Sequence, residues 1–444
     1  MSERQMNLGV FLMGSGHHIA AWRHPNTPQD GFENIDFYKE LAEISERGKL
    51  DMLFISDGLS ITEESHPSEL IRLEPLTLIS HLAGVTEKIG VVATASTTYN
   101  EPFNLARKFA SIDHISKGRA GWNIVTSYYE NDALNFSLPN HPEHDERYAI
   151  ADEFVEVVKK LWDSWEEDAL TRNKEKGIYF DKNKLHIPNH KGKYFNVRGP
   201  LNASRPTQGY PVLIQAGSSS RGKAFAAKTA EVIFTAQQTI EEAQHFYHDI
   251  KNAAKEYGRD PNHVKVLPGV SPIVGRTREE ALEKFEELQD LLPEDIALAF
   301  LSDYLGGLDV YQFDLDSELP EVIPVTNGNQ SRRQLIIDQA RREKLTIRQL
   351  AKKVAGARGH RFIFGTPEEI ADQMQEWFEN EACDGYNLLF PYYPTMFEEF
   401  VDQVIPVLQE RGLFRKEYTG NTLREHLGLP IPQFRTDSLV KTDK

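Results

Sequence analysis

Eight short apolar runs, separated by segments with helical periodicity, limit the folds open to this chain more than any other feature. The runs cover residues 8–13, 52–56, 89–95, 120–126, 212–215, 232–235, 264–274 and 386–390. Most of them are continuous rather than alternating, which is typical of parallel strands buried on both faces. Eight strand–helix units in series, with no obvious linker, predict one α/β domain over residues 1–444. We expect a closed TIM-type (β/α)8 barrel rather than an open doubly wound sheet.

Helix-start signals support this alternation. Four threonines precede a glutamate or glutamine three residues later, in the pattern of a capping box: Thr239, Thr277, Thr346 and Thr366. Two stretches, residues 166–210 and 291–359, exceed ordinary connections. We expect these insertions to cover the C-terminal face of the barrel, and the second is a candidate lid because Tyr304-Leu-Gly-Gly307 and Asn327-Gly-Asn329 are rich in turn residues.

Composition excludes several classes of partner. The net charge of −17 and the dispersed basic residues argue against nucleic acid. No apolar run approaches the roughly 18 residues of a membrane helix, and the first run is too short for a signal peptide. The single Cys383 excludes an intramolecular disulfide, which fits a reducing compartment. We therefore expect a cytoplasmic protein that acts on a small molecule.

The junction after the fifth apolar run suits a phosphate monoester. Residues 212–214 lead directly into Gly217-Ser-Ser-Ser-Arg-Gly222 and then into a helical segment. Free backbone N–H groups, serine hydroxyls, the positive helix end and Arg221 could together hold a phosphate. The alternative is a serine cap on an ordinary turn. Gly14-Ser-Gly16 lacks the third glycine of a dinucleotide fingerprint, so no Rossmann site for a pyridine nucleotide is predicted.

Polar residues also follow the other runs. They include Ser56-Asp57-Gly58, residues 94–98 and residues 123–129, and any loop could show the same composition. His17 and His18 follow the first run and could act as acid, base or hydrogen-bond donor, although they could equally be surface residues. No metal site is predicted, because proline interrupts both His141-Pro-Glu-His144 and His186-Ile-Pro-Asn-His190.

Several motifs together resemble one family. They are Phe54-Ile-Ser-Asp57, residues 101–113, Ser116-Lys-Gly-Arg-Ala-Gly-Trp-Asn-Ile-Val-Thr-Ser127, Arg147-Tyr148, residues 192–222 and Phe364-Gly-Thr-Pro-Glu368. The chain is similar to the bacterial-luciferase-like flavin-dependent monooxygenases, in the branch of the nitrilotriacetate, EDTA, dibenzothiophene-sulfone and long-chain alkane monooxygenases.

The resemblance implies a two-component monooxygenase. Reduced FMN (FMNH2) would come from a separate NAD(P)H:flavin reductase, and a flavin C4a-(hydro)peroxide formed with O2 would oxygenate a small organic substrate. Such chemistry needs a dry, closed pocket, which gives residues 291–359 a purpose as a lid. We expect a homo-oligomer and, as a hypothesis, a sulfur- or nitrogen-containing acid as substrate. A deazaflavin-dependent hydride-transfer oxidoreductase on the same barrel and a non-catalytic flavin-binding relative are the alternatives.

Motif positions also imply the site residues. Those expected against the isoalloxazine or ribityl are Asp57, Thr94, Asn123 and Thr126, and those expected at the ribityl and phosphate end are His144, Tyr148, Gly217, Ser218 and Ser219. His17 and His18 are the candidates for catalysis. An anionic substrate would need a cation, for which the candidates are His17, His18, Arg221, Arg332, Arg333, Arg358 and Arg361.

Overall fold

Eight parallel strands form a closed barrel, as predicted. The computed structural model describes residues 4–63, 65–323 and 330–435. The barrel strands, in spatial order, are β1 (Asn7–Leu12), β2 (Met52–Ile55), β3 (Gly90–Ser96), β4 (Ala120–Val125), β7 (Val212–Gln215), β8 (Val232–Thr235), β9 (Lys265–Val274) and β11 (Gly385–Leu388). The ring closes where β11 pairs with β1, and every pairing around it is parallel.

A ninth parallel strand, β10 (Arg361–Gly365), was not predicted. It pairs with residues 270–274 of β9, whereas β8 pairs with residues 265–268. Val270 faces both Arg361 of β10 and Leu388 of β11, so these two strands lie on opposite edges of β9. The long strand β9 therefore extends past the end of β8, and β10 extends the sheet there, at the C-terminal rim of the barrel.

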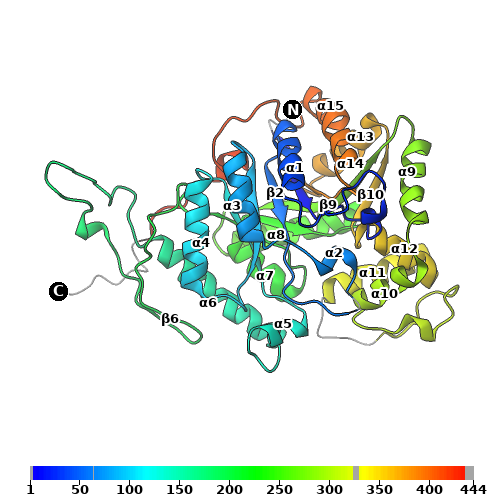
Figure 1. Ribbon diagram of the computed structural model, residues 1–444, viewed down its shortest axis with the longest axis horizontal. Helices are drawn as coiled ribbons and strands as arrows, with labels where there is room; N and C mark the ends of the chain where they lie inside the picture. Colours follow the sequence, from blue (N-terminus) through cyan, green and yellow to red (C-terminus); the bar gives the residue numbers. More distant parts are fainter. Residues whose placement is uncertain (1–3, 64, 324–329, 436–444) are drawn as a thin grey trace.

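Helices cover the outside of the barrel (Figure 1). They are α1 (Ile35–Arg47), α3 (Pro75–Val85), α4 (Pro102–Ile115), α6 (His144–Trp162), α7 (Ser220–Thr229), α8 (Ile240–Glu256), α9 (Arg278–Asp290), α13 (Pro367–Glu379), α14 (Thr395–Glu399) and α15 (Ile405–Glu410), with the short helices α2 (Pro67–Leu70) and α5 (Glu130–Asn135) in the loops. No helix in the described ranges is long and apolar enough to cross a membrane.

Three of the four predicted capping boxes are complete, at Thr239, Thr346 and Thr366. The fourth is half formed. Thr277 accepts a hydrogen bond from the backbone N–H of Glu280, but the Glu280 carboxylate accepts from the backbone and side chain of Arg276 instead of from the cap. A competing cation one residue earlier therefore takes the reciprocal bond.

The C-terminal segment closes the barrel at the N-terminal ends of its strands. Leu423 of α16 (Leu423–His426) packs into the barrel interior together with Leu427 and Leu429. A Cβ at Gly90, the first residue of β3, would lie 2.5 Å from the Leu423 side chain and 2.8 Å from the backbone carbonyl oxygen of Asp51, so the close approach requires glycine. Beside this plug, buried Arg424 donates to both carboxylate oxygens of Glu231 at 2.7 and 2.9 Å.

The second insertion forms a helical layer with its own apolar core. It contains α10 (Glu294–Tyr304), α11 (Gln330–Glu343) and α12 (Ile347–Ala357). Its buried side chains, such as Leu301 and Val354, cluster with Ile19 and Ala20 from the loop after β1. The layer is thus docked at the barrel mouth, where it was expected. Gly306 and Gly307 follow α10 with φ of 83° and 81°, and Asn327-Gly-Asn329 lies outside the described residues.

The first insertion does not cover the C-terminal face, which corrects that expectation. Residues 166–210, with β5 (His190–Lys191) and β6 (Asn196–Val197), project to one side beyond α4 and α6 (Figure 1). Glu153 of α6 accepts hydrogen bonds from the backbone N–H groups of Lys193, Tyr194 and Phe195. Phe195 also meets the ring of Phe154 edge-on at 5.4 Å. These contacts hold the segment against the outer face of α6.

The buried ion pair of the C-terminal plug predicts a stability effect. Arg424→Met should lower the free energy of unfolding by about 3–5 kcal/mol, because it leaves the Glu231 carboxylate buried without its partner. Chemical denaturation would measure this loss. Arg47→Met, which removes a pair between Arg47 and Asp402 that is about half exposed, should cost less than about 1 kcal/mol. Equal losses of unfolding free energy in the two variants would contradict the role of Arg424 and Glu231 as a buried ion pair that stabilises the fold.

Candidate functional site

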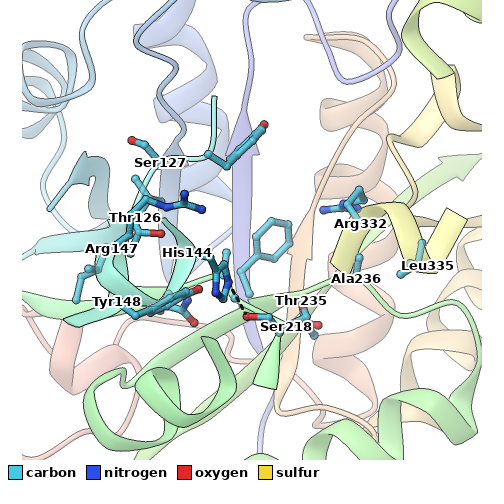
Figure 2. A pocket seen from close by; sticks show the side chains of 18 residues that line it. Thr126, Ser127, His144, Arg147, Tyr148, Ser218, Thr235, Ala236, Arg332 and Leu335 are labelled. Atoms are coloured by element: carbon cyan, nitrogen blue, oxygen red, sulfur yellow. Dashed lines mark hydrogen bonds between the residues drawn. The ribbon is translucent and has the colours of Figure 1, made fainter. Parts of the chain in front are cut away.

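A cavity of about 240 Å³ lies where β4, β7 and β8 end, between the barrel rim and helices α6, α7 and α11. Eighteen residues line it: Ile124, Val125, Thr126, Ser127, Tyr128, His144, Arg147, Tyr148, Gln215, Ala216, Gly217, Ser218, Ser219, Phe234, Thr235, Ala236, Arg332 and Leu335. The structure therefore brings together six of the nine residues predicted to bind the cofactor, several of which are labelled in Figure 2.

The turn between β7 and α7 is compact and exposes backbone. Ser219 caps α7 by accepting a hydrogen bond from Gly222 N at 3.0 Å, and His144 Nε2 lies 3.4 Å from its Oγ. A Cβ at Gly217 would lie 2.3 Å from Gln215 Nε2, 3.0 Å from the Tyr148 hydroxyl and 3.1 Å from Gly222 Cα, so a side chain at this position would force these neighbours to shift. The positive end of a ten-residue helix faces hydroxyl and imidazole groups here, which suits a phosphate monoester.

Arg221 is placed differently from the prediction. Its guanidinium forms an ion pair with Asp152 of α6 at 2.8 Å, and Asp152 also binds Lys228 at 2.9 Å. Arg221 does not line the cavity. The cation on this side of the cavity is instead Arg147, which is buried and donates to the carbonyl of Pro142 at 2.7 Å. The sequence analysis did not predict Arg147 as a cation of the cavity, although Arg147 stands beside Tyr148 in one of the family motifs.

Thr94 and Asn123 meet beside the cavity. Asn123 Nδ2 donates to Thr94 Oγ1 at 2.9 Å, and Thr94 Oγ1 donates to the carbonyl of Ile55 at 2.9 Å, so the two side chains connect β4, β3 and β2. Asn123 Oδ1 is buried and has no hydrogen-bond partner in the described part of the chain. This acceptor is available to a bound N–H or O–H group.

Asp57, in the loop after β2, is not among the residues that line the cavity. Its carboxylate accepts from the backbone N–H of Gly58 at 2.9 Å. Burial raises the pKa of Asp57 to about 6, and the nearby Arg72 only partly offsets this. A carboxylate held this far above its ordinary pKa makes folding less favourable once it ionises.

His17 and His18 are wholly buried rather than exposed. His17 Nε2 donates to the carbonyl of Phe11 at 2.8 Å, and its ring meets the Phe11 ring edge-on at 4.6 Å. Burial, reinforced by Arg358, lowers the pKa of both imidazoles to about 3. Both are therefore neutral at pH 7, a state suited to hydrogen bonding and not to proton donation by an imidazolium.

The other predicted cations differ in their distance from the cavity. Arg358 is buried, where it donates to the His17 carbonyl and to Ser68 Oγ and pairs with Glu69. Arg361 lies over the ring of Trp377 at 4.5 Å, and Arg333 donates to the carbonyl of Ile323 at 2.7 Å. Of the candidate arginines, only Arg332 lines the cavity.

The paired histidines have local partners. His141 bonds the Tyr99 hydroxyl, His186 bonds Glu166, and His190 bonds Glu153. Within the residues that the structure describes, no group of three or more His, Cys, Asp or Glu side chains could hold a metal ion.

The raised pKa of Asp57 predicts a pH-dependent stability change. Below pH 4 the side chain is protonated in both states, and between pH 4 and 6 only the unfolded state releases the proton. The contribution of Asp57 to the free energy of unfolding should therefore fall as pH rises through this window. Asp57→Asn should have little effect at pH 4 but should raise the free energy of unfolding by about 1–3 kcal/mol at pH 8.

Denaturant titrations at the two pH values would measure this gain. Asp338→Asn, at an exposed position of α11, is the matched control and should show no such pH dependence. A gain of equal size at pH 4 and pH 8 would refute the raised pKa.

Comparison with known proteins agrees with this geometry. The family model described as luciferase-like monooxygenase matches residues 6–383. The chain is 59% identical to N-acetyl-S-(2-succino)cysteine monooxygenase of Bacillus subtilis (strain 168), covering 97% of this chain and 98% of that protein. It is 50% identical to nitrilotriacetate monooxygenase component A of Aminobacter aminovorans, with the same coverage.

Among solved structures, a riboflavin lyase crystallised with modified FMN and riboflavin is 34% identical, with a TM-score of 0.87 over 98% of both chains. The family match spans most of the barrel, and the full-length relatives are monooxygenases by name. The chain therefore belongs to the luciferase-like monooxygenase family and is a flavin-dependent monooxygenase that uses reduced FMN.

Proposed function

We propose that this protein is the oxygenase of a two-component system and that its substrate is a thioether polycarboxylate of the N-acetyl-S-(2-succino)cysteine type. The observation that carries the proposal is the 59% identity, over nearly the full length of both chains, to the Bacillus subtilis enzyme of that name. The partner we propose is an NAD(P)H:flavin reductase, in keeping with the component A designation of a relative that is 50% identical.

The cavity offers a coherent set of groups for FMN. We propose that Gly217, Ser218 and Ser219, with the start of α7, hold the phosphate, and that His144 and Tyr148 contact the phosphate and ribityl. Asp57, Thr94, Asn123 and Thr126 are proposed to lie along the ribityl and ring system. The tight packing around Gly217 and the buried acceptor of Asn123 support this placement. Bound reduced FMN supplies two electrons and activates O2.

The chain's own contribution is to exclude water and stray protons from the reaction. Phe11, Phe54 and Phe234 form an aromatic floor inside the barrel, with ring centroids 4.7 to 6.1 Å apart. Neutral His17 packs on this floor, so no imidazolium delivers a proton there. The helical layer of α10, α11 and α12 lies over the mouth. These features provide the dry enclosure that oxygen transfer requires.

The proposed reaction oxidises the carbon that carries sulfur. Its C–H bond becomes C–OH with one oxygen atom of O2, while the second atom leaves as water with the two electrons from reduced FMN. The resulting hemithioketal collapses, because its hydroxyl proton passes to sulfur as the C–S bond breaks. The products are a thiol and a keto acid, here N-acetylcysteine and oxaloacetate.

We further propose a homo-oligomer, a cytoplasmic location and a single domain with two insertions. The projecting residues 171–198 carry eight basic and two acidic side chains in a chain of net charge −17, and this local charge of opposite sign supports association with a second copy. The lone Cys383 is buried, and burial raises the pKa of its thiol to about 12, consistent with an unreactive cysteine.

Reconstitution tests the proposed substrate. The protein, a flavin reductase, FMN and NADH should convert N-acetyl-S-(2-succino)cysteine to N-acetylcysteine and oxaloacetate, with substrate-dependent O2 uptake and mass spectrometry as readouts. Nitrilotriacetate and a long-chain alkane are the comparison substrates. The protein alone should neither oxidise NADH nor reduce FMN. Turnover that needs a deazaflavin in place of FMN, or flavin binding without oxygenation of any substrate, would favour the alternative functions.

Charge at the β7–α7 turn tests the FMN site. Ser218→Asp should weaken FMN binding at least about tenfold, because a carboxylate would face the phosphate dianion in a partly desolvated site. Ser218→Asn introduces a side chain of the same size as aspartate but without its charge, so its FMN affinity should stay within a few-fold of wild type. A fluorescence titration measures both affinities. Equal affinity of wild type and Ser218→Asp would show that the phosphate binds elsewhere.

A further inference from the structure

An ordered hairpin turn forms the far end of the projecting insertion. The backbones of Asn173 and Ile178 exchange two hydrogen bonds, at 2.7 and 3.1 Å, and the N–H of Arg172 donates to the carbonyl of Tyr179 at 2.9 Å. The turn leaves the Ile178 residue 48% exposed and Tyr179 65% exposed. We call residues 171–184 the arm tip. A fixed turn that presents two adjacent apolar side chains to solvent is a candidate contact surface.

The arm tip is also basic. It carries five Lys and Arg side chains against two acidic ones, in a chain whose net charge is −17. Arg172, Lys174 and Lys176 are exposed around the turn that holds Ile178 and Tyr179. The arm tip therefore combines exposed apolar side chains with a positive charge, and a surface that matches it must be apolar and acidic.

The loop after β4 has this complementary composition. Residues 128–146, which include α5 and the first residues of α6, contain five Asp and Glu and no Lys or Arg. We call this segment the acidic loop. Leu134, Phe136 and Leu138 are 66%, 41% and 38% exposed on it. Its exposed acidic residues are Glu130, Glu143, Asp145 and Glu146.

The acidic loop is held in place by contacts with its neighbours. Ser60 Oγ, in the loop after β2, donates to the Asp132 carboxylate at 2.6 Å. The Phe136 ring stacks on the ring of Tyr99, with centroids 4.7 Å apart and an interplanar angle of 25°. The apolar and acidic side chains are thus presented on a preformed surface, so a partner can bind without first ordering the loop.

We propose that the arm tip of one copy of this chain docks on the acidic loop of a second copy. This inference rests on the proposed homo-oligomer and assigns the two surfaces that would make it. In Figure 1 the insertion projects at the left whereas α5 lies at the lower edge, so a molecule does not cover its own acidic loop with its own arm tip. With two-fold symmetry each copy gives one arm tip and receives one, which makes two equivalent contacts.

The contact lies beside the cavity. Tyr128 and His144 line the cavity and belong to the acidic loop. The second copy is therefore placed against the segment that carries part of the proposed FMN site. Apolar side chains of the arm tip meet those of the acidic loop, and charges of opposite sign surround them, as in the core and rim of protein interfaces.

Exchange of charges tests the contact. The arm variant is Lys174→Glu with Lys176→Glu, and the loop variant is Glu143→Lys with Glu146→Lys. Each should raise the dissociation constant of the dimer at least about tenfold, because like charges then face each other in both contacts. The chain that carries all four changes should recover most of the affinity. Sedimentation velocity over a range of protein concentrations measures the dissociation constants.

A matched control changes the same net charge elsewhere. Lys352→Glu with Lys416→Glu replaces two exposed lysines that lie outside the arm tip and the acidic loop. Its dissociation constant should stay within about twofold of wild type, since scattered surface charges contribute little. Equal weakening in this control and in the arm variant would show a general effect of net charge and overturn the inference.

Cross-linking tests the contact without relying on the charge variants. The native Cys383 is buried, so a cysteine introduced at the surface is the reactive thiol. A mixture of the Ile178→Cys and Leu134→Cys proteins, treated with a short bismaleimide, should give a linked pair that contains one chain of each. Leu282→Cys, at an exposed position of α9, replaces Leu134→Cys in the control and should give no such pair.

The outcomes separate the two proposals. A chain that sediments as a monomer would overturn both the contact and the proposed homo-oligomer. A dimer whose affinity is unchanged in the arm and loop variants, or that gives no link between residues 178 and 134, would overturn the contact and leave the homo-oligomer standing. Neither result bears on the proposed substrate, which reconstitution with the reductase tests independently.

Discussion

Closure of the barrel, made where β11 pairs with β1, is the constraint on which the site depends. Because all eight strands of the ring are parallel, every loop that follows a strand emerges at the same rim. Residues that are more than a hundred positions apart along the chain, such as Thr126 and Phe234, thereby line one cavity. The opposite end is filled by Leu423 and its neighbours, so the interior has an apolar plug beneath the chemistry.

Within this frame, close packing and not side-chain chemistry shapes the proposed phosphate site. Gly217 and Gly222 stand so near the Tyr148 hydroxyl that a Cβ at either would lie 3.0 Å or less from it. The backbone N–H groups and the helix end are therefore presented without intervening side chains, as anion-binding turns require. The serine and histidine hydrogen bonds then add specificity to an electrostatic site that the backbone already provides.

The helical layer of α10, α11 and α12 both covers the barrel mouth and contributes residues to the cavity lining. Its apolar core takes in Ile19 and Ala20 from the loop after β1, so the layer is anchored to the barrel by buried side chains. The same layer carries Arg332 to the cavity. One element therefore covers the mouth and brings a positive charge to it, in a chain whose net charge is −17.

The sequence by itself determined the elements of the barrel, because the apolar runs and the capping patterns are local signals that need no knowledge of distant residues. It also predicted that Ser218, Ser219, His144 and Tyr148 lie together, which the cavity shows. It missed β10 because its five residues pair only on the extended part of β9. Whether a short run pairs is decided by the strand beside it.

Tertiary structure alone decided which charges face the cavity. Arg221 stands in the predicted turn, yet Asp152 on a neighbouring helix captures it, whereas Arg147 and Arg332 reach the cavity from helices distant in sequence. The partners of a charged side chain depend on long-range packing, which no local pattern encodes. For the same reason the sequence did not predict where the insertion of residues 166–210 lies in the fold. It lies against α6, where the Glu153 carboxylate accepts hydrogen bonds from three of its backbone N–H groups.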